Sequence, residues 1–251
     1  MISLNGKRAL VTGGSRGIGR ATALLLARCG ASVAVAYHRR RDDADAVVRE
    51  IEALGGRAVA VGGDLGSRAE AERVFDEALS ALGGLDVYVG NAGIWPAEDV
   101  ALADMDDDRW AETLRANLDS VFYTTRVAAR TIGDGGRIVL VTSTAAQRGE
   151  AYHADYAASK GAVVSLVKSL AVELGRRGVT VNSVAPGWVD TDMSAGVLRG
   201  PDRPRIEDSI PVGRIATAED VAGPIVFLCS DEARHVTGEI LNVNGGSVLC
   251  G

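Results

Sequence analysis

Short apolar runs, rich in β-branched residues, alternate along the chain with longer stretches in which apolar residues recur at helical spacing. The apolar runs predict strands at residues 8–11, 32–36, 57–61, 87–89, 137–141, 180–184 and 239–243. The stretches between them predict helices that begin near Gly17, Asp42, Ser67, Met105, Tyr152 and Thr217. Alternating strands and helices imply right-handed crossovers, and several runs are apolar on both faces, as buried parallel strands are. The pattern therefore predicts an α/β fold with a doubly wound parallel sheet.

No linker or repeat divides the 251 residues, a length that suits one large α/β domain. A long irregular segment spans residues 190–211 and is interrupted by Gly196, Gly200, Pro201, Pro204 and Pro211. A stretch of this kind forms a poor helix, a lid over a site, or both. We expect a single domain over residues 1–251, with a substrate lid near 190–211.

Composition and charge narrow the class of protein. The net charge is −6 and no dense basic stripe is present, so nothing indicates a nucleic-acid partner. No apolar run is long enough to span a membrane, and the first residues do not have the pattern of a signal peptide. The cysteines (Cys29, Cys229 and Cys250) are scattered, odd in number and without metal-ligand spacing. We therefore expect a cytoplasmic protein without a metal site.

A glycine-rich loop, TGGSRGIG at residues 12–19, follows the first predicted strand and opens the first predicted helix. Gly13 permits a tight turn, while Gly17 and Gly19 let the backbone and the helix approach a pyrophosphate. The free N–H groups and the positive dipole end of the helix then face that phosphate. The loop therefore predicts a dinucleotide site.

The residues after the second predicted strand indicate which dinucleotide this is. A site for NAD usually has an acid about twenty residues beyond the loop, which holds the ribose 2′-hydroxyl. No Asp or Glu occurs between Gly19 and Asp42, whereas Arg16 and Arg39 offer guanidinium groups that suit a 2′-phosphate. We expect NADP(H), the alternative being that both arginines are simply exposed to solvent.

Two further motifs end predicted strands at the edge where ligands collect in such sheets. After the third strand comes the pair Asp64-Leu65, in which Asp64 either accepts the adenine amino group or caps the next helix. After the fourth comes Asn91-Ala92-Gly93, whose small residues let the backbone approach the cofactor ribose, although such residues are also common in turns.

The candidate chemistry lies in three side chains. Tyr156 and Lys160 are one helical turn apart, and Ser143 comes thirteen residues before Tyr156. Most of the 27 basic residues are arginine, so a lysine at position 160 stands out, and its compact ammonium fits under a ribose and beside a phenol. Such a group can move a proton onto or off a carbonyl oxygen. The alternative is that Tyr156 and Lys160 merely share a helix face.

Together these motifs resemble the short-chain dehydrogenase/reductase family over essentially the whole chain. The resemblance implies a single-domain Rossmann fold of about seven strands with helices on both faces, NADP(H) as cofactor and a homotetramer. One departure is Gly90, where the family often has a second asparagine, and we expect it to alter packing rather than chemistry. The resemblance rests on the glycine loop, Asp64-Leu65, Asn91-Ala92-Gly93, Asn117, Ser143, Tyr156-x-x-x-Lys160, Pro186-Gly187 and Val243-Asn244-Gly245-Gly246.

The resemblance also implies roles for these residues. Tyr156 is the general acid in ketone reduction, and Lys160 lowers the pKa of Tyr156 and binds the nicotinamide ribose. Ser143 polarises the substrate carbonyl. Asn117 holds a water through its main chain, unless it is only a polar residue at a helix kink. The implied cofactor-binding residues are Gly13, Ser15, Arg16, Gly17, Ile18, Gly19, Arg39, Asp64, Leu65, Asn91, Ala92, Gly93, Tyr156, Lys160, Pro186, Gly187, Val189 and Thr191.

The substrate is less constrained. The chain is most similar to bacterial 3-oxoacyl-[acyl-carrier-protein] reductases, but other ketoreductases and sugar dehydrogenases share the same segments. An acidic carrier protein calls for basic residues at the pocket rim, and here the loop at 131–136 has Asp134 and no base, which leaves Arg176 and Arg177. We expect NADPH-dependent reduction of a 3-oxoacyl thioester. The alternatives are a dehydrogenase of a sugar, polyol or small secondary alcohol and, more remotely, a non-catalytic nucleotide-binding scaffold.

Four residues near the motifs are further candidates for the substrate pocket. Trp95, Trp188 and Glu150 are candidates for the substrate pocket, although both tryptophans equally suit an ordinary core. His153 precedes Tyr156 by three residues on one helix face, so it either touches substrate or is a surface histidine.

Overall fold

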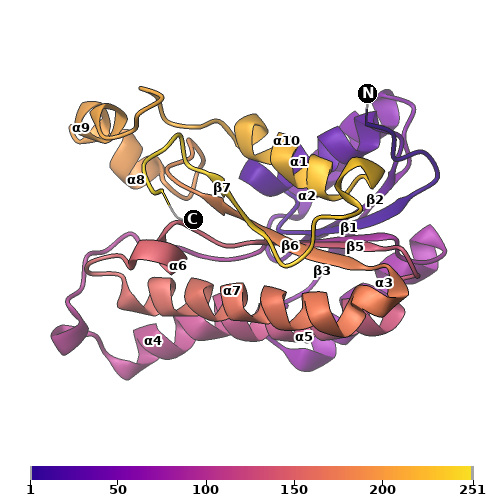
Figure 1. Ribbon diagram of the computed structural model, residues 1–251, viewed down its shortest axis with the longest axis horizontal. Coiled ribbons are helices and arrows are strands. Elements are labelled where there is room, and N and C mark those ends of the chain that lie inside the picture. The colour runs from indigo at the N-terminus through magenta and orange to yellow at the C-terminus, as the bar shows by residue number, and fades with distance from the viewer. Residues whose placement is uncertain (1, 250–251) are drawn as a thin grey trace.

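Seven parallel strands lie in the order β3-β2-β1-β4-β5-β6-β7 (Figure 1). Their bounds are β1 (Arg8–Thr12), β2 (Ser32–Tyr37), β3 (Ala58–Gly62), β4 (Val87–Gly90), β5 (Arg137–Val141), β6 (Thr180–Pro186) and β7 (Ile240–Val243). The computed structural model describes residues 2–249, so Cys250 lies outside the described residues. The strand order reverses between β1 and β4, and doubly wound sheets bind ligands in the crevice at such a point.

Helices cover both faces of the sheet. Their bounds are α1 (Gly17–Arg28), α2 (Arg41–Ala53), α3 (Arg68–Leu82), α4 (Asp107–Leu114), α5 (Ser120–Thr131), α6 (Ala145–Arg148), α7 (Ala154–Leu174), α8 (Ala195–Leu198), α9 (Arg203–Asp208) and α10 (Ala218–Leu228). One layer contains α1, α2 and α10, and the layer on the opposite face contains α3, α4, α5 and α7 (Figure 1). A π-helical turn, Arg115–Asp119, joins α4 to α5. None of the helices described within residues 2–249 is long and apolar enough to cross a membrane.

Alternate residues of the central strands enter two separate hydrophobic cores. Val11 of β1 and Val139 of β5 belong to the core beneath α1, α2 and α10, whereas Leu10 and Leu140 belong to the core beneath α3, α5 and α7. This explains why the strands are apolar at successive positions. A Cβ added to Gly90 would lie 2.6 Å from Cδ2 of Leu140, so the departure at this position is a matter of packing, as expected.

The predicted elements are confirmed, with ends that differ by up to two residues. β6 runs two residues beyond its predicted end because Ala185 and Pro186 pair with β7. Thr217 and Asp220 form a capping box that starts α10 where a helix was predicted. The segment 190–211 folds into the short helices α8 and α9, and Leu198 and Ile210 form a small core of their own with Ile215. That this segment acts as a lid stays a prediction.

Candidate active site

Two cavities at the carboxyl edge of the sheet share part of their lining. The first, of about 440 Å³, surrounds the glycine loop, and we call it the glycine-loop cavity. The second, of about 300 Å³, surrounds Tyr156, and we call it the tyrosine cavity. Because residues of the glycine loop and of the segment after β4 line both spaces, a ligand can extend from one into the other. The shared residues are Ile18, Asn91, Gly93, Ile94, Thr191 and Met193.

The predicted site residues divide between the two cavities. The glycine-loop cavity is lined by Gly13, Ser15, Arg16, Gly17, Ile18, Arg39, Asp64, Leu65, Asn91, Ala92, Gly93 and Thr191. The tyrosine cavity is lined by Ser143, Tyr156, Lys160, Pro186, Gly187 and Val189. Gly19 and Asn117 line neither space, because both lie buried behind the cavity walls.

Close backbone contacts shape the glycine loop. Gly13 has a φ of +62°, a conformation that side chains disfavour. A Cβ on Gly19 would lie 2.2 Å from the carbonyl oxygen of Gly13, far inside contact distance. The first turn of α1 therefore packs directly against the loop, and any side chain at position 19 would push them apart.

Hydrogen bonds fasten the loop to the end of β4. The Thr12 hydroxyl accepts hydrogen bonds from the backbone N–H groups of Asn91 (3.0 Å) and Ala92 (3.1 Å). The side-chain amide of Asn91 in turn donates to the carbonyls of Thr12 (3.0 Å) and Gly13 (3.2 Å). The side chain of Asn91 thus holds the loop, a role that its place in a turn-like motif did not indicate.

Arginines gather at the outer end of the glycine-loop cavity. Nη1 of Arg16 lies 3.3 Å from Oδ2 of Asp192, and Nη1 of Arg40 lies 3.9 Å from the same oxygen. Arg39 lines the cavity as well and forms no ion pair with any residue in the described range 2–249. Arg16 and Arg39 are exposed to solvent and also line the cavity, so their role in binding a 2′-phosphate stays a prediction. The sequence did not indicate Asp192, which comes from a distant segment.

Asp64 is held by a residue that sequence reasoning missed. Its carboxylate accepts hydrogen bonds from the backbone N–H of Gly66 (3.0 Å) and from Nη1 of Arg115 (2.8 Å). The Arg115 guanidinium lowers the pKa of Asp64. The alternative that Asp64 caps α3 is wrong, because Ser67 is the N-cap residue and no side chain caps that helix. Arg115 lies in the π-helical turn, too far along the chain for any local signal.

Lys160 is buried in the wall of the tyrosine cavity. Its Nζ donates to the carbonyl of Val141 (3.1 Å) and lies 5.8 Å from the centre of the Tyr156 ring. A Cβ on Gly93 would lie 2.8 Å from Oδ1 of Asn117 and 3.3 Å from Nζ of Lys160. The glycine therefore lets β4, the π-helical turn and α7 meet at one point.

Burial dominates the protonation of both groups. It raises the pKa of Tyr156 to about 12, and the nearby Ser143 hydroxyl opposes that rise while Glu150 adds to it. It also lowers the pKa of Lys160 to about 8. That Lys160 lowers the pKa of Tyr156 stays a prediction. Lys160 is buried and Tyr156 is half-buried at the cavity wall, so each charged form loses hydration.

The hydroxyls that follow β5 differ in their availability. Thr142 donates its hydroxyl hydrogen to the carbonyl of Val184 (2.8 Å). The Ser143 oxygen accepts a hydrogen bond from the Ala145 N–H (3.1 Å), and the Ser143 hydroxyl lies close enough to Tyr156 to lower the pKa of that phenol. Ser143 is thus the residue of this pair that can donate into the tyrosine cavity.

The side chain of Asn117 closes the loop that follows β4. Its Oδ1 accepts from the N–H of Ile94 (2.7 Å), and its Nδ2 donates to the Ile94 carbonyl (2.9 Å). The surrounding π-helical turn is a feature often found at functional sites. The predicted water on the Asn117 main chain stays a prediction.

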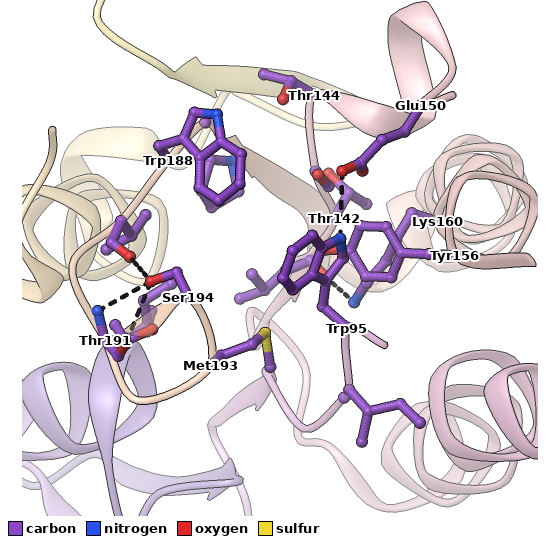
Figure 2. Close-up of a pocket in the computed structure, with 18 of the residues that line it drawn as sticks. Trp95, Thr142, Thr144, Glu150, Tyr156, Lys160, Trp188, Thr191, Met193 and Ser194 are labelled. Atoms are coloured by element: carbon purple, nitrogen blue, oxygen red, sulfur yellow. Dashed lines mark hydrogen bonds between the residues drawn. The ribbon is translucent and has the colours of Figure 1, made fainter. Parts of the chain in front are cut away.

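Two indole rings and a carboxylate form one wall of the tyrosine cavity (Figure 2). The Trp95 N–H donates to Oε1 of Glu150 (3.2 Å). The rings of Trp95 and Trp188 pack edge to face, with 5.8 Å between their centroids and an interplanar angle of 80°. His153 stacks on Trp95 at 4.8 Å and is only 3% exposed. The tryptophans therefore line the pocket, and the interpretation of His153 as a surface residue is wrong, since it lies buried behind Trp95.

Comparisons with known proteins agree with this geometry. A family model described as enoyl-(acyl carrier protein) reductase matches residues 13–247. The chain is 42% identical to an L-rhamnose 1-dehydrogenase (NAD(P)(+)) of Sphingomonas sp., over 97% of this chain and 96% of that protein. It is 41% identical to a 3-oxoacyl-[acyl-carrier-protein] reductase of Synechocystis sp., over 99% of this chain and 100% of that protein.

A solved structure extends the likeness to three dimensions. A short-chain dehydrogenase from Burkholderia cenocepacia in complex with NADP has a TM-score of 0.92 and 42% identity, covering 97% of this chain and 98% of its own. The chain belongs to the short-chain dehydrogenase/reductase family. Like other short-chain dehydrogenases/reductases, it is an oxidoreductase with a single-domain Rossmann fold.

The basic residues considered for carrier docking do not rim the tyrosine cavity of this short-chain dehydrogenase/reductase. Tyr156 lies at the start of α7, whereas Arg176 and Arg177 follow its end, about 30 Å away at the helical rise per residue. Nε of Arg177 also pairs with Oδ1 of Asp134 at 3.0 Å. Within one chain, the predicted docking patch is therefore distant from the pocket and partly neutralised.

Proposed function

We propose that this family member is an NADP(H)-dependent oxidoreductase that interconverts a ketone and a secondary alcohol, with Tyr156 as the proton donor. The observation that carries the proposal is the meeting of Ser143, Tyr156 and Lys160 in a cavity that joins the glycine-loop cavity. A scaffold that only bound a nucleotide would have no need of this arrangement.

The glycine-loop cavity fits a dinucleotide with a 2′-phosphate. The glycine loop that borders it is packed so closely that added Cβ atoms at Gly13 or Gly19 would displace it, and the outer end of the cavity carries Arg16, Arg39 and Arg40. Guanidinium groups are well suited to phosphate. The NADP in the Burkholderia cenocepacia structure supports this assignment. The bound nicotinamide would supply or accept the hydride.

Side chains of this protein would donate the proton to the carbonyl oxygen and position that oxygen. With a pKa of about 12, Tyr156 is protonated at neutral pH and can donate to the carbonyl oxygen during reduction. The Ser143 hydroxyl, which lies beside Tyr156 in the tyrosine cavity, would hold that oxygen in place. Lys160 uses one of its donors on Val141, and the others are available to ribose hydroxyls. We also assign the water-holding role to the main chain of Asn117, and a lid role to residues 190–211.

Two substrate classes are supported by relatives of nearly equal identity. The Synechocystis reductase supports a 3-oxoacyl thioester, and the Sphingomonas dehydrogenase supports a sugar. The distance of Arg176 and Arg177 from the tyrosine cavity weakens the case for an acidic carrier protein bound to a single chain. In a homotetramer, which we also propose, a neighbouring chain could present these arginines instead.

The proposal is tested by following nicotinamide absorbance with NADPH and NADH, using an acetoacetyl thioester and a panel of ketones, sugars and polyols. Tyr156→Phe should reduce turnover by about 10²- to 10⁴-fold, the usual contribution of general acid catalysis, while NADPH still binds. Tyr123→Phe, a change in α5 outside both cavities, is the matched control. NADPH binding without turnover of any substrate would favour the scaffold instead, and a preference for NADH would remove the roles of Arg16 and Arg39.

A further inference from the structure

A carboxylate with unused hydrogen-bonding capacity faces the tyrosine cavity. Glu150 lines this cavity, and its side chain is 20% exposed. Within residues 2–249, the Trp95 N–H is the single hydrogen-bond donor to that carboxylate. An ionised carboxylate has about four acceptor positions, so most of its capacity is open. Burial raises the pKa of Glu150, as expected where few partners replace lost water.

The charged groups around Glu150 leave the carboxylate without a close cation. Nδ1 of His153 lies 4.0 Å from Oε1 of Glu150 but 3.8 Å from Oδ1 of Asp99. Arg148 also lines the cavity, where it is exposed, and it forms no ion pair with Glu150 or any other acid among residues 2–249. The carboxylate of Glu150 therefore suits uncharged hydrogen-bond donors better than it suits an anionic group.

The indole rings set a flat apolar surface beside this acceptor. Glu150 and Trp95 are joined by the indole N–H, and Trp188 approaches Trp95 nearly at a right angle. His153 covers one face of Trp95 and fixes the ring. A ligand with an apolar ring face and hydroxyl groups on its edge could satisfy both surfaces at once.

We propose that Glu150 selects a neutral polyhydroxylated substrate, a sugar or a polyol, by accepting hydrogen bonds from hydroxyl groups next to the reacting carbon. The inference rests on the proposed function, because Tyr156 defines which carbon reacts. The reacting end of a 3-oxoacyl thioester carries two carbonyl acceptors and no hydroxyl. It would leave the carboxylate of Glu150 facing other acceptors, at the cost of an unsatisfied buried group.

A matched pair of alcohols tests this selection. Oxidation of trans-cyclohexane-1,2-diol and of cyclohexanol by NADP⁺ transfers one hydride to the nicotinamide and releases one hydroxyl proton to solvent by way of Tyr156, which passes its own proton on. The two substrates differ by a single hydroxyl. We expect the wild-type kcat/KM to favour the diol by about tenfold or more, the usual value of a hydrogen bond to a charged group. Glu150→Leu should remove this preference, and Glu150→Gln, which keeps one acceptor oxygen, should reduce it less.

A second readout measures binding without turnover. Two of the three tryptophans, Trp95 and Trp188, line the pocket, so titration with the diol in the presence of NADPH, which cannot accept a hydride, should change the fluorescence of the protein. Glu150→Leu should weaken that binding about tenfold. The control is Glu98→Leu, an exposed acid on the loop after β4, and thermal melting and NADPH affinity check that each variant folds.

The outcomes separate this inference from the proposed function. Equal kcat/KM values for the diol and cyclohexanol, unchanged in Glu150→Leu, would overturn the selection by Glu150 and leave the oxidoreductase assignment intact. A strong preference for the acetoacetyl thioester over every polyol would do the same. Absence of NADP(H)-linked turnover with the whole panel would overturn both.

Discussion

The glycine-loop cavity and the substrate wall of the tyrosine cavity are built in different ways. The first is shaped by backbone atoms, in particular by the contact of Gly19 with Gly13 and by the bonds that Thr12 exchanges with the end of β4. The second is made of side chains from three separate loops, namely Trp95, Glu150 and Trp188. The backbone surface leaves no room for substitution, whereas the side-chain wall can change without moving a strand.

This difference explains why relatives of similar sequence identity act on different substrates. Proteins about 40% identical to this chain over nearly their whole length have names for sugar and for acyl-thioester chemistry. A constant dinucleotide surface combined with a variable wall would allow such a change of substrate. The substrate class is therefore best inferred from the side chains of this wall, among which Glu150 is the charged one.

The largest effect on cofactor binding is expected at the backbone contact between Gly19 and Gly13. Gly19→Ala places a Cβ 2.2 Å from the Gly13 carbonyl oxygen, so the loop must shift, at a cost of about 1–3 kcal/mol in stability. We expect the Kd for NADPH to rise about tenfold or more. Gly161→Ala is the matched control, since it adds a methyl group inside α7 with 3.9 Å to its nearest neighbour and should be neutral or slightly stabilising. Equal NADPH affinity in the two variants would break the contrast between the cavities.

A pH effect is expected at the point where the cavities meet. Burial lowers the pKa of Lys160 to about 8, so the free enzyme loses this charge as pH rises through that value. We expect kcat/KM for NADPH-dependent reduction to fall about tenfold per pH unit above about 8, because the ammonium no longer donates to the cofactor. In Lys160→Arg the fall should move to higher pH, while Lys168→Arg, an exposed change on the same helix, should leave it in place.

Stability should change in the opposite direction over the same range. The folded-state pKa of Lys160 is below its ordinary value of 10.5, so between about pH 8 and 10 the unfolded chain binds more protons than the folded one. The free energy of unfolding therefore gains a contribution from Lys160 as pH rises. Above about pH 10, the raised pKa values of Tyr156 and Tyr88 act against it. Denaturant titrations of the wild type and Lys160→Arg would measure the difference, and identical pH slopes would contradict the assignment.

The smallest effect is expected at the exposed arginines. Asp192 pairs with Arg16 and approaches Arg40, so it competes with a 2′-phosphate for these guanidinium groups. Asp192→Asn should raise the preference for NADPH over NADH by about two- to fivefold, the range of an exposed ion pair. Asp202→Asn, on the same irregular segment but outside both cavities, serves as the control. An unchanged ratio of kcat/KM values would show that Asp192 stays clear of the cofactor.

The sequence predicted the parts of the molecule that depend on local order. The strands, the glycine loop and the Tyr156–Lys160 spacing are periodic or contiguous features, and the structure has them where they were expected. Asp64 and Arg115 are separated by 51 positions along the chain, and Arg16 and Asp192 by 176 positions. Only the tertiary fold brings the members of each pair together. The pKa values of Tyr156 and Lys160 were equally out of reach, because they follow from burial.

The π-helical turn Arg115–Asp119 gives the helix formed by α4 and α5 two faces that are out of phase. Each residue of an α-helix turns the side-chain direction by about 100°, so one additional residue in a turn offsets everything that follows. Before the turn, Thr113 and Arg109 bond Asp155 at the start of α7. After it, Thr124 bonds the buried Tyr88 in the sheet. Deleting one residue here would keep the helix but rotate its second half by more than a quarter-turn, and the active-site contacts and the core contacts could no longer form together.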